Sequence, residues 1–302
     1  MRIYYFNITY RCNSNCLFCA ADHNSNNDVR EMSIEEFKRA LDDNHVEKND
    51  RIILNGGEPT VHKDFFSFLD IAHAYGVKID LFSNGIRFQD QIFTKRVLEY
   101  GNIHIRIPLF GSSAETHDFL TNCAGSFNAV TKGLDNICNR ISDSASLEVK
   151  MLLSRATISE NEKIYELVVS RWNTGKTTLS LNPLLISNSV ISNKELFIDT
   201  YYNMMDASQS LLMRACGKKP YLSVSLVPYC SFPNEELFFQ YNPMLKKREH
   251  DYFYADPLQS KEKLDKSINE DCSKCRYYGY CPGFPHSYLQ YFGTSEIKPF
   301  YK

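Results

Sequence analysis

Six short apolar runs alternate along the sequence with amphipathic stretches, and this alternation leaves few folds open. The apolar runs lie at residues 3–9, 51–54, 77–82, 103–109, 147–153 and 178–185. Their lengths and composition predict buried strands. Between them, Ser33–Glu36 and Ser159–Glu162 have the spacing of helix capping boxes, and Asp64 can cap a helix that ends before Gly76. Six strand–helix units predict a parallel sheet with crossover helices, either an open doubly wound sheet or an incomplete barrel.

Three loops that follow consecutive predicted strands carry residues that can bind a metal or a ligand. In both architectures ligands bind at the carboxyl ends of the strands. The first loop holds three cysteines, the second contains a glycine pair, and the third is polar. In order, they read Cys12-Asn-Ser-Asn-Cys16-Leu-Phe-Cys19, Asn55-Gly56-Gly57-Glu58-Pro59-Thr60 and Ser83-Asn84-Gly85. We expect paired glycines to let the backbone approach a ligand closely, and Glu58 to offer a carboxylate to an ammonium group.

Three cysteines at this spacing can converge on one metal centre. A four-iron cluster that only stores electrons takes four protein ligands, so three leave one iron open to a substrate or cofactor. A structural zinc loop is the alternative, although zinc loops more often use paired C-x2-C knuckles and need a fourth ligand close by. A coincidental spacing is the remaining interpretation. The three-cysteine loop favours a cluster with one open iron.

Composition limits the class of protein and its compartment. The chain has 302 residues, 43% of them hydrophobic, and a formal net charge of −2, which does not favour nucleic acid as a partner. No signal peptide is visible at the N-terminus, and no apolar stretch reaches the ~18 residues of a membrane span. We therefore expect a cytoplasmic protein. Ten cysteines in that compartment point to metal rather than to disulfides.

Taken together, the three loops resemble those of the radical S-adenosylmethionine (SAM) superfamily. C-x3-C-x2-C, Gly-Gly-Glu-Pro and Ser-Asn-Gly occur in the expected order and on the expected elements, and the resemblance covers residues 1–205. It implies an α/β fold, a partial (βα)6 TIM-type barrel. It also implies that Cys12, Cys16 and Cys19 hold a site-differentiated 4Fe-4S cluster whose open iron chelates S-adenosylmethionine.

The same resemblance assigns the cofactor contacts. The residues expected to bind S-adenosylmethionine are Gly56, Gly57, Glu58, Pro59, Ser83, Asn84 and Phe18. For Phe18, simple loop packing is an equally good interpretation. His117 and Asp118 are expected to brace their loop, and Arg155 is expected to be an ordinary surface residue rather than a cofactor contact. Cys123 lies on a loop at the catalytic end and could donate a hydrogen atom to a product radical, whereas Cys138 fits a buried apolar role.

The last third of the chain holds the second group of cysteines. Tyr221–Val227 alternates between apolar and polar residues and predicts a β-hairpin with Cys216 and Cys230 at its ends. A C-x2-C-x5-C segment follows at Cys272, Cys275 and Cys281, which alone could bind zinc. With the first half it resembles the SPASM and Twitch domains, which implies one auxiliary 4Fe-4S cluster in a smaller α+β domain at residues 206–302. The first choice of ligands is Cys216, Cys230, Cys272 and Cys275, and the second choice has Cys281 replacing one of them.

Three functions remain open from the sequence. The first is a radical SAM enzyme that cleaves S-adenosylmethionine to a 5′-deoxyadenosyl radical and modifies a peptide or protein by cross-linking, oxidation or epimerisation. The second is a dehydrogenase or epimerase of a small hydroxylated molecule such as a sugar or aminocyclitol. The third is a metal-binding protein without catalysis, which the cofactor loops disfavour. The implied partners of an enzyme are a reductant such as flavodoxin or ferredoxin and, for a peptide, a separate leader-peptide-binding protein, because the predicted barrel begins at Ile3.

Overall fold

A computed structural model describes residues 1–302 except 21–29, 237–240, 242–251, 255–265, 268–269 and 302. Its centre is a parallel sheet in the strand order β7-β6-β5-β4-β3-β2-β1-β8. The strands of the sheet are β1 Ile3–Thr9, β2 Arg51–Gly56, β3 Lys78–Phe82, β4 Ile103–Pro108, β5 Ser146–Leu153, β6 Thr177–Pro183, β7 Leu222–Val224 and β8 Tyr252–Tyr254. The order of β1 to β7 has no reversal, so the sheet is an incomplete barrel rather than a doubly wound sheet.

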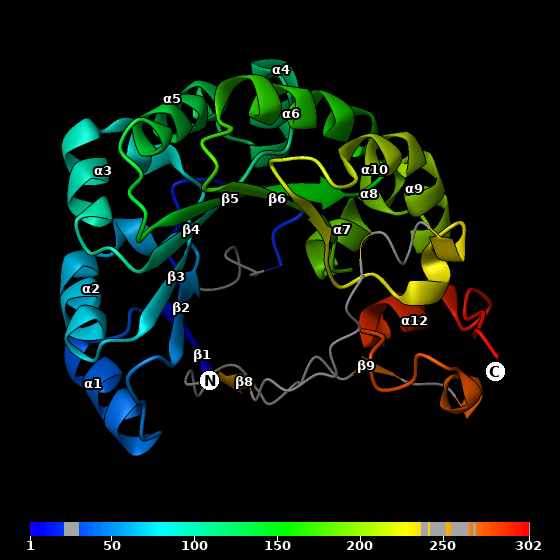
Figure 1. The fold of residues 1–302 in the computed structure, drawn as a ribbon, viewed down its shortest axis with the longest axis horizontal. Coiled ribbons are helices and arrows are strands. Elements are labelled where there is room, and N and C mark those ends of the chain that lie inside the picture. Colours follow the sequence, from blue (N-terminus) through cyan, green and yellow to red (C-terminus); the bar gives the residue numbers. More distant parts are fainter. Residues whose placement is uncertain (21–29, 237–240, 242–251, 255–265, 268–269, 302) are drawn as a thin grey trace.

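Most of the helices lie on the outside of the curved sheet, which forms an open arc in Figure 1, whereas α7 is within the arc and α12 is at its open side. The helices are α1 Ile34–Asp43, α2 Phe65–Ala74, α3 Gln91–Leu98, α4 Ala114–Thr121, α5 Ser126–Cys138, α6 Ile158–Arg171, α7 Asn188–Ser192, α8 Lys194–Phe197, α9 Tyr201–Ala207, α10 Gln209–Ala215 and α12 His286–Phe292. Among the residues that the structure describes, none of these helices has the length and apolar character needed to cross a membrane. The predicted six-unit partial barrel is confirmed.

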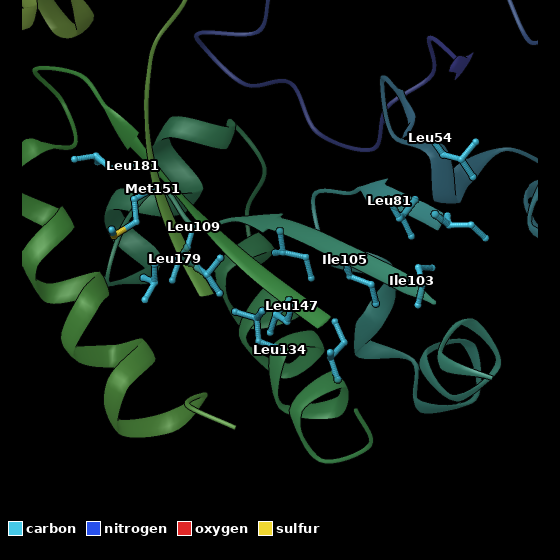
Figure 2. Close-up of a cluster of buried hydrophobic side chains, with 14 of the residues drawn as sticks. Leu54, Leu81, Ile103, Ile105, Leu109, Leu134, Leu147, Met151, Leu179 and Leu181 are labelled. Carbon is cyan, nitrogen blue, oxygen red and sulfur yellow. The ribbon is translucent and has the colours of Figure 1, made fainter. Parts of the chain in front are cut away.

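Alternation along the strands separates an apolar outer face from a polar lumen. On β4, Ile103, Ile105 and Ile107 are buried, while the residues between them are partly exposed. Figure 2 shows Ile105 and Leu147 of neighbouring strands close to Leu134 of α5. Each such fully buried side chain contributes about 1.5–3 kcal/mol to stability. The core therefore lies between sheet and helices, and the polar positions of the strands face the inside of the arc.

Of the three predicted helix caps, Ser33 is confirmed, Ser159 is wrong, and Asp64 is confirmed in its position only. Ser33 forms the expected capping box with Glu36: the Glu36 backbone N–H donates to Ser33 Oγ over 3.1 Å, and the Ser33 backbone N–H donates to Glu36 Oε2 over 2.7 Å. Ser159 does not cap, because α6 begins at Ile158 and Thr157 is its N-cap residue. Asp64 is at the N-cap of α2 but makes no side-chain capping bond. The Ser-x-x-Glu sequence of a capping box can also occur inside a helix, so the sequence alone does not locate the helix start.

The predicted hairpin at Tyr221–Val227 is wrong. Leu222–Val224 forms the single strand β7, which pairs in parallel with β6 and extends the sheet. The 3-10 helix η3, Tyr229–Ser231, follows it. Alternation shows that one face of a strand is buried but not which strand it pairs with, and the free edge of β6 was the available partner. The division at residue 205 stays a prediction.

The C-terminal segment packs against the barrel through aromatic rings. Besides α12 it contains the 3-10 helix η4, Glu270–Lys274, and an antiparallel pair, β9 Lys266–Ser267 with β10 Phe284–Pro285. Tyr288 of α12 stacks on Tyr201 of α9 with ring centres 4.1 Å apart, and its hydroxyl accepts a hydrogen bond from the Tyr201 backbone N–H over 2.9 Å. This contact holds the last part of the chain beside α9, at the open side of the arc (Figure 1).

Candidate active site

A cavity of about 380 Å³ lies at the carboxyl ends of the strands. The cysteine loop forms one wall, and residues at the ends of β2 to β6 form the rest. The predicted site residues on its surface are Cys12, Cys16, Phe18, Cys19, Gly57, Glu58, Ser83 and Asn84. Three loops far apart in sequence thus meet around one space, as the strand-end argument predicted. Gly56 and Pro59 lie beside this space without lining it.

The cysteine loop is held against α4 by its backbone. The N–H groups of Asn15 and Leu17 donate to the carbonyl oxygens of Thr121 and Leu120 over 3.1 and 3.0 Å. None of the three cysteines forms a disulfide, and all three are partly exposed. While α4 holds the loop on one side, Cys12, Cys16 and Cys19 all line the cavity.

Burial makes the thiols of Cys12 and Cys16 poor acids. Burial raises the pKa of Cys12 to about 11 and that of Cys16 to about 12, and the neighbouring thiols add to both shifts. Metal binding must therefore displace protons from these groups. In the part of the chain that the structure describes, no three His, Cys, Asp or Glu side chains stand close enough to hold a single metal ion. A four-iron cluster is wider than one ion, so its ligands surround a larger space.

The glycine pair approaches the backbone that leads from β1 into the cysteine loop, and its predicted approach to a ligand stays a prediction. A Cβ atom on Gly56 would lie 2.1 Å from the Thr9 carbonyl oxygen, and one on Gly57 would lie 2.3 Å from that of Arg11. Gly57 N–H donates to Thr9 O over 2.7 Å, and Glu58 N–H donates to Arg11 O over 2.8 Å. Only glycine allows this approach, so the pair sets the position of the cysteine loop relative to β2.

Glu58 braces the second and third loops. Its carboxylate is fully buried, and Oε1 accepts hydrogen bonds from Thr60 N–H, Thr60 Oγ1 and Ser83 Oγ over 3.1, 2.6 and 2.8 Å. Oε2 accepts from the Asn84 backbone N–H over 2.5 Å. Burial raises the pKa of Glu58, and these four bonds act against that shift. A carboxylate has about four acceptor positions, so the contact with an ammonium group stays a prediction.

Phe18 is packed into an aromatic group at the edge of the cavity. Its ring meets those of Phe110 and Phe197 edge-on, with centres 4.7 and 5.5 Å apart. Phe110 stacks on His117, whose Nδ1 accepts a hydrogen bond from the Phe110 backbone N–H over 3.2 Å. Burial lowers the pKa of His117 to about 4, so its ring is neutral. His117 braces this loop, as predicted.

Asp118 caps the next helix, also as predicted. Its carboxylate accepts hydrogen bonds from the backbone N–H groups of Gly125 and Phe127, both over 2.7 Å, and from Ser126 Oγ over 2.9 Å. Arg155 donates to the Glu195 carbonyl oxygen over 3.2 Å and lies 3.6 Å from Asp199, away from the cavity. Arg155 is therefore a surface residue.

Cys123 stands beside the cysteine loop rather than on the cavity wall. Its sulfur donates to the Asn13 carbonyl oxygen over 3.5 Å, and it is absent from the cavity lining. Hydrogen donation by Cys123 stays a prediction. Cys138 is largely buried at the end of α5, with its sulfur 3.7 Å from the Trp172 carbonyl oxygen. That position fits an apolar role.

A second, smaller space of about 40 Å³ lies in the C-terminal segment. Four cysteines line it: Cys230, Cys272, Cys275 and Cys281. The sulfur of Cys281 accepts hydrogen bonds from the backbone N–H groups of Tyr229 and Gly283, both over 3.4 Å. Cys216 does not line this space but caps the C-terminal end of α10. The geometry thus favours the second choice of ligands, in which Cys281 replaces Cys216.

Sequence reasoning missed two cations on the wall of the main cavity. Arg106 of β4 and Lys150 of β5 both line it. The signal was present, because a charged residue at every second position of an otherwise apolar strand marks a polar face. The runs Ile103-His-Ile-Arg-Ile-Pro108 and Ser146-Leu-Glu-Val-Lys-Met-Leu-Leu153 have that pattern.

Comparisons with known proteins agree with this geometry. The model of the radical SAM superfamily matches residues 6–168. Mycofactocin maturase MftC of Mycolicibacterium smegmatis is 30% identical over 132 residues, which are 44% of this chain and 33% of that protein. Fe-coproporphyrin III synthase of Methanosarcina barkeri is 28% identical over 163 residues, which are 54% of this chain and 40% of that protein. The chain thus spans less than half the length of either relative.

Solved structures share the fold at low sequence identity. Streptococcus suis SuiB bound to the precursor peptide SuiA matches with a TM-score of 0.62 and 11% identity, over 96% of this chain and 72% of that chain. Native anSMEcpe with bound AdoMet and Cp18Cys peptide matches with a TM-score of 0.59 and 12% identity, over 100% of this chain and 92% of that chain. At such identities these matches show the fold alone.

Proposed function

This chain belongs to the radical SAM superfamily, and we propose that it is a radical SAM enzyme that modifies a peptide or protein substrate. The observation that carries the proposal is the cavity of about 380 Å³, which is lined by the three cysteines of the loop, by Glu58 and by the Ser83-Asn84 loop. A scaffold protein has no need of a space that joins a metal-binding loop to a polar cradle.

The residues present fit the cofactors of this superfamily. Cys12, Cys16 and Cys19 would hold a 4Fe-4S cluster with one open iron. Gly56, Gly57, Glu58, Pro59, Ser83, Asn84 and Phe18 would hold S-adenosylmethionine next to it. When bound, the two together supply a carbon radical that abstracts hydrogen from a substrate. The chain itself binds and orients them, and its cavity limits the access of water.

The C-terminal cysteines would hold one auxiliary 4Fe-4S cluster. Four thiols around one space match the four ligands of a cluster that carries electrons. Such a cluster can accept an electron from the substrate, which suits an oxidation or a cross-link. A flavodoxin or ferredoxin would supply reducing electrons in the cytoplasm.

Similar proteins support a peptide as the substrate. One relative is a mycofactocin maturase, and the solved structures of SuiB and anSMEcpe contain peptides. A separate leader-peptide-binding protein would deliver the peptide if it carries a leader.

Metal content and cofactor cleavage test the proposal. Anaerobic reconstitution should give about eight irons per chain, and alanine at Cys12, Cys16 and Cys19 should leave about four. With reductant, the protein should convert S-adenosylmethionine to 5′-deoxyadenosine and methionine. Stoichiometric zinc without iron in anaerobically purified protein would overturn the proposal.

Co-expression of the protein with small open reading frames from the same genomic neighbourhood tests whether its substrate is a peptide. We expect one encoded peptide to change mass only when the Cys12 loop is intact. Modification of a sugar or aminocyclitol instead, with every peptide unchanged, would favour the small-molecule alternative.

A further inference from the structure

The lumen below the main cavity contains a ladder of charged side chains that crosses four strands. Arg51 Nη1 of β2 lies 3.0 Å from Asp80 Oδ2 of β3, and Arg106 Nη2 of β4 lies 2.8 Å from the same oxygen. Arg106 Nη1 lies 3.5 Å from Glu148 Oε2 of β5. In this ladder each carboxylate is shared between groups on neighbouring strands. Buried charges persist only when they are paired in this way.

Both oxygens of Glu148 are engaged. Oε2 also lies 3.1 Å from His104 Nε2, and Oε1 accepts a hydrogen bond from Ser180 Oγ. Lys150 is two residues further along β5, and its charge is attracted by Glu148 but repelled by Arg106. Both Glu148 oxygens therefore have partners other than Lys150.

Lys150 carries the unmatched charge of this group. Arg51, Arg106 and Lys150 provide three positive charges against the two negative charges of Asp80 and Glu148. Within the described ranges of the chain, the Lys150 ammonium makes no hydrogen bond or ion pair, and it lies 4.8 Å from the centre of the Phe82 ring. Glu58 also lines the cavity, but four donors already hold its carboxylate.

The unmatched ammonium opens onto the cavity. Lys150 lines it together with Pro108, its register partner on β4, and Asn182 of β6. In the sheet, β4, β5 and β6 follow β1 to β3, whose loops carry the proposed cofactor contacts. A half-buried cation at this place lacks part of its hydration and gains from an anionic partner.

We propose that Lys150 anchors a carboxylate of the substrate inside the cavity. The inference rests on the proposed function and narrows its substrate: the part of the peptide that enters the barrel carries an aspartate, a glutamate or a free C-terminus. The Phe82 ring packs against the ammonium, and the Asn182 amide lines the same cavity. Because S-adenosylmethionine also has a carboxylate, the experiment measures peptide binding and cofactor binding separately.

Peptide selection tests the substrate arm. Holoenzyme with S-adenosylmethionine is mixed with N-acetylated random hexapeptides, half with free and half with amidated C-termini, and retained peptides are identified by mass spectrometry. We expect about tenfold enrichment of carboxylate-bearing peptides over their amide counterparts, the size of one charge-assisted contact. Lys150→Met should abolish the enrichment, and Lys150→Arg should restore it. Equal retention of acids and amides by the wild type, or unchanged enrichment by Lys150→Met, would overturn the proposal.

Equilibrium dialysis of S-adenosylmethionine against the same variants tests the cofactor arm. If Lys150→Met weakens cofactor binding tenfold and leaves peptide selection unchanged, the carboxylate belongs to the cofactor, and the substrate assignment is overturned. Lys95→Met, at a lysine on α3 that is 72% exposed, is the matched control and should change neither measurement. Both arms measure binding, so their failure is distinct from an absence of iron or of cofactor cleavage, which would overturn the proposed function.

Discussion

The side-chain amide of Asn84 donates a hydrogen bond to Asn13 Oδ1 over 2.6 Å, which joins the end of β3 to the cysteine loop. The backbone N–H of the same residue donates to Glu58. One asparagine thus connects all three loops of the site. Because Asn13 lies between Cys12 and Cys16, the position of two proposed cluster ligands depends on this contact.

Asn84→Ala should loosen the cysteine loop without unfolding the barrel. It removes the bonds that Asn84 donates to Asn13 and Ser14 and the one that its Oδ1 accepts from the Ile86 N–H, with a cost of about 1 kcal/mol each. We expect a chelator to remove the Cys12-loop iron several-fold faster from this variant than from the wild type, and absorbance spectroscopy measures the rate. Asn203→Ala, which removes a surface amide bonded to Asp199, is the control. Equal rates for both variants would show that the Asn13 contact does not hold the loop.

Gly57→Ala should displace the cysteine loop by steric conflict. Its Cβ would lie 2.3 Å from the Arg11 carbonyl oxygen, a distance that forces the backbone to move. Iron analysis should find about half of the wild-type content, because only the auxiliary site remains intact. Gly175→Ala, where the added Cβ meets open space, should keep all of it. Full iron in Gly57→Ala would contradict the close approach described above.

Glu58→Gln should weaken S-adenosylmethionine binding nearly as much as Glu58→Ala. All four partners of the carboxylate are donors, so a glutamine would place its NH2 group against another donor. We expect roughly a tenfold rise in Kd, measured by equilibrium dialysis at matched cluster content. If both variants bound the cofactor like the wild type, the Gly-Gly-Glu loop would have no part in its site.

The sequence predicted the meeting of the three loops because parallel strands place their carboxyl ends at one edge. It also predicted that His117 and Asp118 are structural. It could not show that Gly57 contacts Arg11, because a glycine pair looks the same whether it faces a ligand or a neighbouring loop. The role of Lys150 was missed for a related reason: alternation shows which face a side chain is on, but strand register decides that Arg106 pairs with Asp80 and Glu148 while Lys150 does not.

Glu148→Gln should destabilise the barrel in a pH-dependent way. Burial alone would raise the pKa of Glu148, but the His104 hydrogen bond, the Arg106 charge and the Ser180 hydroxyl outweigh it and lower the pKa to about 2. A lowered carboxyl pKa stabilises the folded state above the usual value of 4.5, and this contribution is lost as the pH falls from there through about 2.

Urea unfolding at several pH values measures this effect. At neutral pH Glu148→Gln should lose roughly 3 kcal/mol of unfolding free energy, and the gap from the wild type should shrink below about pH 4.5. Glu162→Gln, at a carboxylate that is 44% exposed and 3.0 Å from Arg214, should show a small gap throughout. A gap for Glu148→Gln that stays constant down to about pH 3 would contradict the role of its ionised form.

Single alanine substitutions should identify the ligands of the auxiliary cluster. Cys216 lies at the end of α10, apart from the space lined by the other four C-terminal cysteines, so Cys216→Ala should keep about eight irons per chain. Alanine at Cys230, Cys272, Cys275 or Cys281 should each lose or destabilise about four of them. Because ligand bonds couple to folding, these four variants should also lower the thermal stability of the C-terminal segment while the Cys12-loop iron remains. Loss of iron in Cys216→Ala together with full iron in Cys281→Ala would restore the first choice of ligands. If all five variants keep their iron, the segment holds no cluster, and the reaction is redox-neutral or uses an external electron acceptor.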